Sequence, residues 1–351
     1  MKNFKLWILI LLVLIVVVVV GIFVLIKNMV PQDLDKQLKK VVVQASWVID
    51  AELAPITSAI KQGYYADEGL EIVLRPGGIQ GTAFLDGTVL LSQDDTIDIA
   101  IANDMTTQIL AKDKGDFYVK SIGAIWQINP SGLLVKADKN IKNLKDIANY
   151  PNFRIGFGGD NWIVKAIADY IGVEQSHFKE IVVGGDATAF LTDQVDGLLC
   201  YWTTQAYEAE LAGVDYDFIP LSTMPGYSNP SLVVQAREQT IEQDPDMLEA
   251  FMRATIKGAQ YVANNSKDAA MSVISSELGT LDLSVDHQKW MINKSLELKL
   301  LNYEYDNSKY LMLNETQIKD YLAWLYKYKQ IENEHDINNE IDLSILNKIY
   351  K

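Results

Sequence analysis

Short apolar runs alternate with longer amphipathic stretches between residues 41 and 236, and most of the runs end in polar or glycine-rich turns. This alternation is typical of buried strands separated by helices, as in a parallel sheet. We expect strands at 41–43, 70–74, 97–102, 117–126, 133–135, 153–157, 181–183, 196–200, 216–220 and 231–235. Beyond residue 241 the apolar spacing is helical, and we expect helices at 244–264, 267–278, 284–301 and 316–330.

The stretch from residue 46 to residue 78 forms the first strand–helix–strand unit of this pattern. Its helix has Pro55 in the first turn, where a missing N–H costs little, and stops at Gly63. Such a unit implies a parallel sheet with a right-handed crossover, and ligands of such sheets lie at the carboxyl ends of the strands. Trp47, Asp50 and Glu52 follow the first strand, so we expect them beside a ligand.

Aromatic and polar residues also follow the other predicted strands. The predicted ligand-binding residues are Trp47, Asp50, Glu52, Asn103, Asp104, Trp126, Gln127, Asp160, Asn161, Trp162, Tyr201, Trp202, Thr203 and Tyr227. Aromatic faces combined with a few amide, hydroxyl and carboxylate groups suit a flat heteroaromatic ligand. The alternative is that each tryptophan is part of the core; the pairing of four tryptophans with polar neighbours favours an aromatic cleft between two lobes.

The N-terminal segment predicts a membrane anchor. Residues 6–26 contain no charged side chain, and a helix of that length spans ~30 Å, the thickness of a hydrocarbon core. Lys2 and Lys5 precede the run, which favours a cytoplasmic N-terminus. The run is longer than the apolar part of a signal peptide and has no small-residue cleavage site. We therefore expect an uncleaved anchor at 1–27, a polar tether at 28–40, and the rest of the chain outside the cytoplasm.

The amino-acid composition argues against several classes of function. The net charge is −15 and there are four arginines, which argues against a nucleic-acid partner. The single cysteine, Cys200, permits no intramolecular disulfide and no thiolate zinc site. The glycine-rich turn at 156–159 lacks the third spaced glycine of a dinucleotide site, and Asp160 would repel a pyrophosphate. We expect no cofactor, no metal and no catalytic residue.

A set of motifs in a fixed order resembles one family. The motifs are Trp47, Ala51-Glu52, Gly63-Tyr64-Tyr65, Glu68-Gly69-Leu70, Pro76-Gly77-Gly78, Trp126-Gln127, Pro130-Ser131-Gly132, Leu144-Lys145-Asp146, Gly156-Phe157-Gly158-Gly159, Val195-Asp196-Gly197, Pro245, Ala250-Phe251-Met252-Arg253-Ala254 and Lys257-Gly258. Together they resemble the extracytoplasmic solute-binding proteins of the thiamine-pyrimidine and riboflavin type, whose superfamily also contains fungal pyrimidine synthases and relatives that bind sulfonate or nitrate. The resemblance covers residues 41–330.

The resemblance implies an α/β fold of the second periplasmic-binding-protein type, with two α/β lobes and a chain that crosses between them twice, near Pro130 and Pro225. Lobe 1 would comprise 41–130 and 225–351, and lobe 2 would comprise 131–224. The implied function is the capture of a thiamine pyrimidine precursor or a riboflavin-like solute for an ABC permease and its ATPase, by a monomer. Several relatives have Tyr-Asn-Glu where this chain has Thr203-Thr204-Gln205, so one carboxylate is missing and the choice of ligand stays open.

Three other functions compete with this one. A sulfonate or nitrate receptor would recruit arginine, but Arg75, Arg154, Arg237 and Arg253 lie away from the predicted strand ends. A pyrimidine synthase of the fungal branch would need a lysine for pyridoxal phosphate, a histidine and a cysteine-rich iron segment, and residues 98–106 contain neither lysine nor histidine. A membrane-coupled sensor would need a signalling domain, whereas about five residues precede the apolar run.

Overall fold

The structure is a computed structural model that describes residues 37–78, 85–159, 161–276, 284–301 and 309–351. The predicted anchor at 1–27 and most of the tether at 28–40 lie outside the described residues. Within the described ranges, no helix has both the length and the apolar character needed to cross a membrane.

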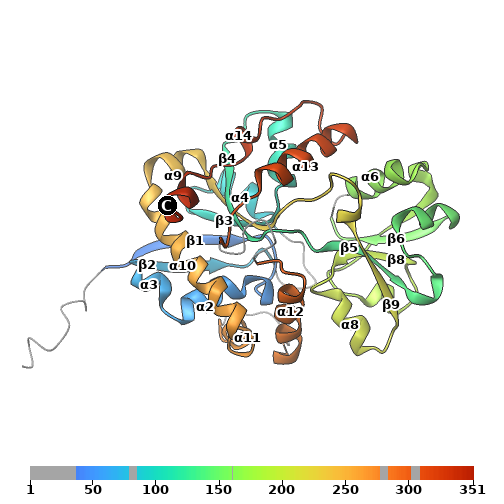
Figure 1. Cartoon of the computed structure of the whole chain (residues 1–351), viewed down its shortest axis with the longest axis horizontal. Coiled ribbons are helices and arrows are strands. Elements are labelled where there is room, and N and C mark those ends of the chain that lie inside the picture. The colour runs from blue at the N-terminus through green and yellow to red at the C-terminus, as the bar shows by residue number, and fades with distance from the viewer. Residues whose placement is uncertain (1–36, 79–84, 160, 277–283, 302–308) are drawn as a thin grey trace, which may run out of the picture. The chain divides into compact units, whose positions relative to one another are not determined.

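Two five-stranded sheets carry the described fold (Figure 1). Sheet A has the order β2-β1-β3-β10-β4. Its strands are β1 (Lys39–Ala45), β2 (Leu70–Arg75), β3 (Ile99–Asp104), β4 (Val119–Trp126) and β10 (Ser231–Arg237). β1 is parallel to both β2 and β3, whereas β10 is antiparallel to β3 and β4. The parallel pairing confirms the strand–helix–strand unit predicted for 46–78.

Sheet B has the order β7-β6-β8-β5-β9. Its strands are β5 (Ser131–Lys136), β6 (Phe153–Phe157), β7 (Phe178–Val182), β8 (Gly197–Tyr201) and β9 (Tyr216–Pro220). β6 is parallel to β7 and β8, whereas β5 is antiparallel to β8 and β9. Each sheet therefore has a parallel group whose carboxyl ends share one edge.

The chain passes between the sheets twice within the described residues. It leaves sheet A after β4 and enters β5 through residues 127–130, and it returns from β9 to β10 through residues 221–230. The second connection begins with the short 3₁₀ helix η5 (Leu221–Thr223). The lobe boundaries at 130 and 225 stay a prediction, while the strands on either side of them belong to different sheets.

Helices of two sequence regions surround sheet A, some packing on its strands and others on those helices. The N-terminal group comprises η1 (Ala51–Leu53), α2 (Ala54–Lys61), α3 (Tyr64–Asp67), α4 (Gly87–Gln93) and α5 (Thr106–Lys114). The C-terminal group comprises α9 (Glu238–Gln243), α10 (Pro245–Asn264), α11 (Ser266–Ile274), α12 (Val285–Glu297), α13 (Glu315–Lys327), α14 (Ile337–Glu340) and α15 (Ser344–Ile349). The elements beside the strands of sheet B are η2 (Ala137–Lys139), η3 (Leu144–Asn149), α6 (Trp162–Ile171), η4 (Gln175–His177), α7 (Thr188–Leu191) and α8 (Gln205–Leu211).

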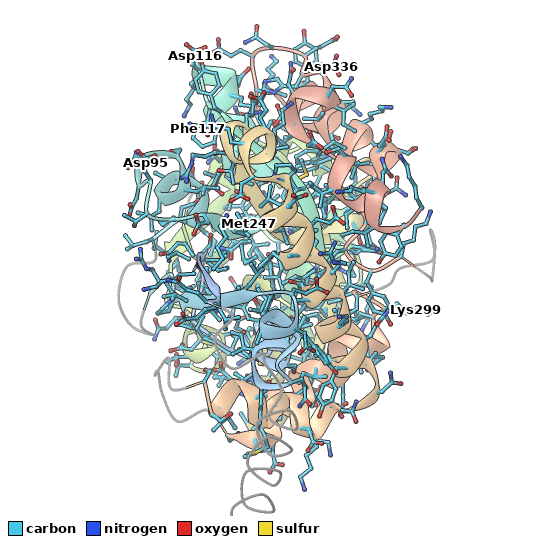
Figure 2. All side chains as sticks on the ribbon, turned by 90° about the vertical axis from the view of Figure 1, so that its left-hand side faces the viewer. Asp95, Asp116, Phe117, Met247, Lys299 and Asp336 are labelled. Carbon is cyan, nitrogen blue, oxygen red and sulfur yellow. The ribbon has the colours of Figure 1, made fainter. Side chains whose placement is uncertain are left out.

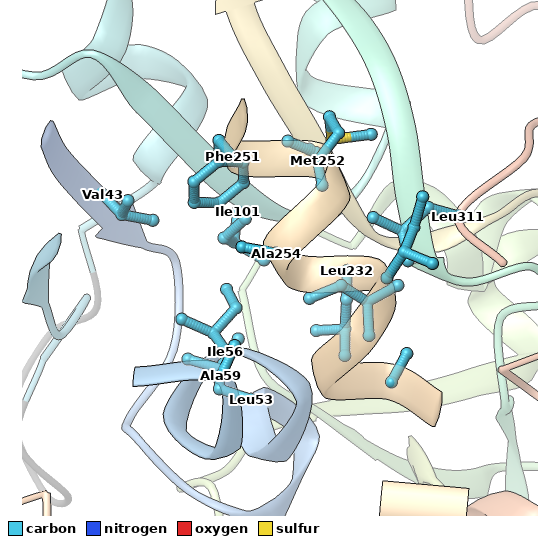
Figure 3. Close-up of a cluster of buried hydrophobic side chains, with 14 of the residues drawn as sticks. Val43, Leu53, Ile56, Ala59, Ile101, Leu232, Phe251, Met252, Ala254 and Leu311 are labelled. Carbon is cyan, nitrogen blue, oxygen red and sulfur yellow. The ribbon is translucent and has the colours of Figure 1, made fainter. Parts of the chain in front are cut away.

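The packing of α10 on α2 and sheet A forms the largest core. Phe251 and Ala254 of α10 face Ile56 of α2, and all three are buried beside strand residues such as Val43 (Figure 3). Gly258 permits this packing, because a Cβ there would lie 2.0 Å from the carbonyl oxygen of Pro55. The same core includes Ile49, Ala51 and Leu53, so it holds the turn that carries Asp50 and Glu52.

Many acidic side chains are exposed, in contrast to a small buried set that includes Asp50, Glu52 and Glu340. Figure 2 labels three exposed ones, Asp95, Asp116 and Asp336, near the margin of the view, whereas Met247 of α10 is buried near its centre. This distribution agrees with the negative net charge being carried by solvated side chains.

The predicted elements differ from the structure mainly at their ends. The strand predicted at 181–183 is β7, which begins three residues earlier at Phe178 and ends at Val182. The pattern did not predict the short C-terminal helices α14 and α15. Their apolar residues are too few to show a period, and they bury Ile337, Ile345 and Leu346 through tertiary contacts.

Candidate functional site

A cavity of about 620 Å³ lies where strands of both sheets end. Sheet A contributes side chains that follow β1 and one at the end of β3, and sheet B contributes the turns after β6 and β7 and the end of β8. The lining residues are Trp47, Glu52, Asn103, Gly158, Gly159, Val183, Gly184, Gly185, Leu199, Cys200, Tyr201, Thr204 and Gln205. Its volume is in the range of cavities that hold a small organic ligand.

The turn from Trp47 to Glu52 places the one carboxyl side chain of that lining set. Asp50 is the N-cap of η1 and accepts a hydrogen bond from the backbone N–H of Glu52 at 2.9 Å. The N–H of Ala51 donates to Oε1 of Gln288 on α12 at 2.6 Å. Pro55 then lies in the first turn of α2, where its missing N–H costs little. These contacts hold the Glu52 backbone in place on two sides.

The carboxyl pair at this turn is deeply buried: Asp50 is 5% exposed and Glu52 is 4% exposed. Burial raises the pKa of Asp50 to about 7, although backbone hydrogen bonds oppose the shift. Burial, and then the nearby charge of Asp50, raise the pKa of Glu52 well above its ordinary value. Among the described residues that line the cavity, none is lysine, arginine or histidine. Glu52 is therefore a buried acid without a basic neighbour in the cavity wall, suited to a ligand that donates hydrogen bonds.

The aromatic part of the wall is formed by Trp47 and Tyr201. The hydroxyl of Tyr201 donates to the carbonyl oxygen of Asn103 at 3.2 Å and lies 3.0 Å from Oγ of Ser231. Burial, assisted by the charges of Asp104 and Glu52, raises the pKa of Tyr201 well above its ordinary value, so it stays protonated. The ring of Trp126 lies behind Tyr201, with centroids 6.2 Å apart, and is almost fully buried.

Glycine turns form much of the sheet B side. The pairs Gly158-Gly159 and Gly184-Gly185 follow β6 and β7. A Cβ built on Gly158 or Gly184 meets nothing within 4 Å, so these positions border open space. Gly159 has a φ of 84°, which favours glycine. The ligand can therefore approach the backbone of both turns closely.

The segment after β8 completes the wall with neutral groups. Nε2 of Gln205 donates to the carbonyl oxygen of Gly185 at 2.8 Å, and the Thr204 hydroxyl donates to Oε1 of Gln205. Burial, and to a lesser degree the charge of Glu208, raise the pKa of the Cys200 thiol above its ordinary value. The thiol thus stays protonated at neutral pH.

Four of the predicted site residues line the cavity: Trp47, Glu52, Asn103 and Tyr201. Asp50 supports Glu52 from behind, and Asp160 lies outside the described residues. The other eight described site residues, which are absent from the lining set, are Asp104, Trp126, Gln127, Asn161, Trp162, Trp202, Thr203 and Tyr227. Their assignment as ligand-binding residues stays a prediction.

Most of these eight residues have partners elsewhere in the protein. Trp162 packs edge-on against Trp324 with centroids 6.5 Å apart, and Tyr227 packs against the same ring at 4.9 Å. The backbone N–H of Gln127 donates to the carbonyl oxygen of Leu300 at 2.7 Å. The remaining partners are Phe218 for Trp202, Glu180 for Asn161, and Thr106 and Asn129 for Asp104.

Sequence reasoning missed the glycine pairs and the residues Val183, Leu199, Cys200, Thr204 and Gln205. A usable signal was present, because both glycine pairs directly follow predicted strands, as the tryptophans do. The cysteine is half-buried in the cavity wall.

The four arginines are engaged outside the cavity. Arg154 binds Asp196 at 2.8 Å, Arg253 binds Glu68 at 2.9 Å, and Arg75 lies 3.9 Å from Asp94. Arg237 donates to the backbone carbonyls of Leu91 and Ile97. None of them is in the lining set, so the described wall offers no guanidinium to an anionic ligand.

Comparison with solved structures identifies the fold. The periplasmic nitrate-binding protein NrtA from Synechocystis PCC 6803 matches with a TM-score of 0.60 and 13% identity, over 89% of this chain and 88% of that chain. The periplasmic aliphatic sulphonate-binding protein SsuA from Escherichia coli matches with a TM-score of 0.59 and 11% identity, over 87% and 92%. The chain therefore has the two-sheet α/β fold of periplasmic binding proteins.

Sequence comparison defines the family. Residues 50–269 match the family described as NMT1/THI5 like, and the chain belongs to that family. The resemblance found in the motifs is thereby confirmed.

Three curated relatives carry the names of different functions. A 4-amino-5-hydroxymethyl-2-methylpyrimidine phosphate synthase of Legionella pneumophila is 24% identical over 66% of this chain and 71% of its own length. The riboflavin-binding protein RibY of Chloroflexus aurantiacus is 23% identical over 74% and 72%. The formylaminopyrimidine-binding protein of Halalkalibacterium halodurans is 23% identical over 85% and 88%.

Proposed function

We propose that this protein is the solute-binding component of an ABC importer and captures a small heteroaromatic solute that carries N–H donors. The observation that carries the proposal is that the buried acid Glu52 lines the same cavity as the aromatic residues Trp47 and Tyr201. Aromatic faces bind a flat ring, and a carboxylate accepts hydrogen bonds from ring or exocyclic N–H groups. A thiamine pyrimidine precursor and a riboflavin-like molecule both have these features, and the names of two relatives support them.

The proposal includes a place in the cell. The apolar run at 6–26 would anchor the protein in the membrane, with the binding domain outside the cytoplasm and near a permease and its ATPase. We expect the full-length protein to fractionate with membranes and to be accessible to protease from outside the cell. We expect a monomer, which light scattering of the purified protein would test.

A ligand screen on the full-length protein tests the proposed solute class. Native mass spectrometry of the freshly purified protein would reveal a retained ligand. Titration of tryptophan fluorescence with an aminopyrimidine, formylaminopyrimidine, riboflavin, taurine and nitrate would then rank the classes. Saturable binding of one of the first three supports the proposal, whereas binding of taurine or nitrate alone refutes it.

An anion receptor is the second candidate, because the glycine turns after β6 and β7 present backbone to the cavity and α6 begins shortly after one of them. Backbone N–H groups at such turns bind anions in other proteins. The solved relatives that bind nitrate and sulphonate agree with this candidate. Glu52 opposes it, because a carboxylate in the wall repels an anion.

We propose that the protein is not an enzyme, although one relative is named a synthase. Pyridoxal phosphate, which synthases of the fungal branch use, does not fit this wall. Its described lining contains no lysine for the aldehyde and no basic side chain for the phosphate. Saturable product formation by the purified protein would overturn this part of the proposal.

A further inference from the structure

Helix α12 contacts both sides of the cavity region. Through Gln288 it accepts the hydrogen bond of the Ala51 N–H at 2.6 Å and so holds the turn that carries Glu52. Its buried residues Met291 and Ile292 belong to the core of sheet A and α10. The helix also contacts α8, which directly follows the end of β8 in sheet B. Figure 1 shows α12 beside α8, between the two groups of strands.

The face of α12 toward α8 is aromatic and polar. His287, Trp290 and Lys294 are spaced by three and four residues, so they share one face of the helix. The ring of His287 stacks on Tyr207 with centroids 4.3 Å apart and planes at 20°, and Trp290 lies 5.3 Å from the same ring. Nε1 of Trp290 donates to Glu210 at 3.1 Å.

Lys294 extends this contact to the strands of sheet B. Its ammonium group lies 5.5 Å from the ring centroids of both Trp202 and Trp290, within the range of cation–π interactions. Trp202 itself stacks on Phe218 of β9, with centroids 4.6 Å apart. The Lys294 side chain is 14% exposed and also pairs with Glu297 at 2.9 Å. A cation held between two indoles thus joins α12 to sheet B.

These contacts are separate from the two connections that join the sheets covalently at 127–130 and 221–230. If the sheets move apart by bending at the connections, the contacts between α12 and α8 must break. With the Lys294–Trp202 contact beside α8, they comprise two ring contacts on Tyr207, one hydrogen bond and one shared cation. Each shifts an equilibrium by roughly threefold to tenfold. Such a contact is weak enough to open and specific enough to define a closed state.

We propose that α12 is a latch that holds the cavity closed, with His287, Trp290 and Lys294 on one side and Tyr207, Glu210 and Trp202 on the other. Because Gln288 on the same helix holds the Glu52 turn, the latch couples the position of that acid to closure. Trp202, which the sequence predicts to contact the ligand, here forms a cation–π contact with the Lys294 ammonium group. The inference concerns closure alone and holds whichever solute the cavity binds.

Cys200 provides a reporter for the test, because it is the single thiol of the chain and lines the cavity. The rate at which a bulky fluorescein maleimide labels Cys200 in the full-length, unliganded protein measures how often the cavity opens. We expect Trp290→Ala and Lys294→Met each to raise this rate about tenfold, whereas the control Asn293→Ala, at an exposed position of the same helix, leaves it unchanged. Equal rates in all four proteins, with unchanged circular dichroism, would overturn the latch.

A distance measurement distinguishes an opened cavity from a damaged one. In a Cys200→Ser background, spin labels at Val182→Cys of β7 and Met271→Cys of α11 report the separation of the two sheets, since both side chains are partly or fully exposed. Lys294→Met and Tyr207→Ala, which break the latch from opposite sides, should both shift the distance distribution to longer values. A distribution identical to that of the parent in both variants would refute the proposal, even if one variant labels faster for another reason.

Discussion

The substitution Glu52→Gln tests the chemistry of the cavity with opposite outcomes for the two ligand classes. The variant keeps the shape of the side chain and one acceptor oxygen, replaces the other oxygen by an NH2 donor, and removes the ability to ionise. A hydrogen bond to a charged acceptor contributes about 1.5–3 kcal/mol, so we expect an N–H-donating heteroaromatic ligand to bind roughly 10–150-fold more weakly. Removing a nearby carboxylate cannot weaken the binding of an anion, so taurine or nitrate would bind equally well or more tightly.

The pH dependence of the binding affinity provides a second test of the two ligand classes. In the unliganded protein the pKa of Glu52 is raised by burial and by Asp50, so the acid must lose a proton to accept hydrogen bonds from a donor ligand. Binding of such a ligand therefore releases a proton, and its affinity rises with pH by up to about tenfold per pH unit below the unliganded pKa. The variant should lose this dependence on Glu52, and an anionic ligand should show the opposite trend.

Isothermal titration calorimetry of the full-length protein at several pH values, in buffers of different ionisation enthalpy, measures both the affinity and the released proton. Glu208→Gln is the matched control, since burial also raises the pKa of Glu208 but this residue accepts from the Ala187 N–H at 2.8 Å and is not in the lining set. If Glu52→Gln binds an aminopyrimidine or riboflavin with the affinity and proton release of the parent, Glu52 does not contact the ligand and the proposed solute class loses its support.

Three further predictions concern the same site. Trp47→Ala should weaken binding by about 0.5–1.5 kcal/mol or more through lost stacking. The ring of Trp162 packs on Trp324, so Trp162→Ala should leave the dissociation constant unchanged in fluorescence titrations. The reverse result would move the ligand toward α6. Gly184→Ala should fold with unchanged thermal stability, because its Cβ meets nothing within 4 Å, yet bind the ligand more weakly by narrowing the cavity; unchanged affinity would place the ligand away from this turn. Burial raises the pKa of Asp50 to about 7, so between about pH 4 and 7 the folded protein retains a proton that the unfolded chain has released. The unfolding free energy of the unliganded protein should therefore fall over this range by up to ~1.4 kcal/mol per pH unit more than that of Asp50→Asn. Parallel curves of unfolding free energy against pH, measured by urea denaturation, would contradict this.

The sequence predicts the architecture well because the strands of both sheets are short apolar runs that end in turns. Sequence pattern also places Trp47, Glu52, Asn103 and Tyr201 at strand ends, where the parallel groups of the two sheets meet the cavity. It cannot tell which side of a strand end faces a ligand. The same pattern therefore predicts Trp47, which lines the cavity, and Trp162, whose ring packs on a helix more than 150 residues later in the chain. The aromatic residues that follow the predicted strands likewise contain no information about α12, because its contacts with Tyr207 and Trp202 arise from long-range packing.

The position of β10 has a consequence for the synthesis of the chain. This strand lies between β3 and β4 in sheet A, yet it follows β4 in sequence by roughly a hundred residues that include the whole of sheet B. At a translation rate of ~5–20 residues per second, β3 and β4 wait on the order of 5–20 s for their shared partner. The five strands of sheet B are synthesised during this interval, while the edges of β3 and β4 that β10 later covers remain available for wrong pairing. A nascent chain that stalls after β9 therefore keeps the facing edges of β3 and β4 unpaired, and these edges are open to pairing with another chain.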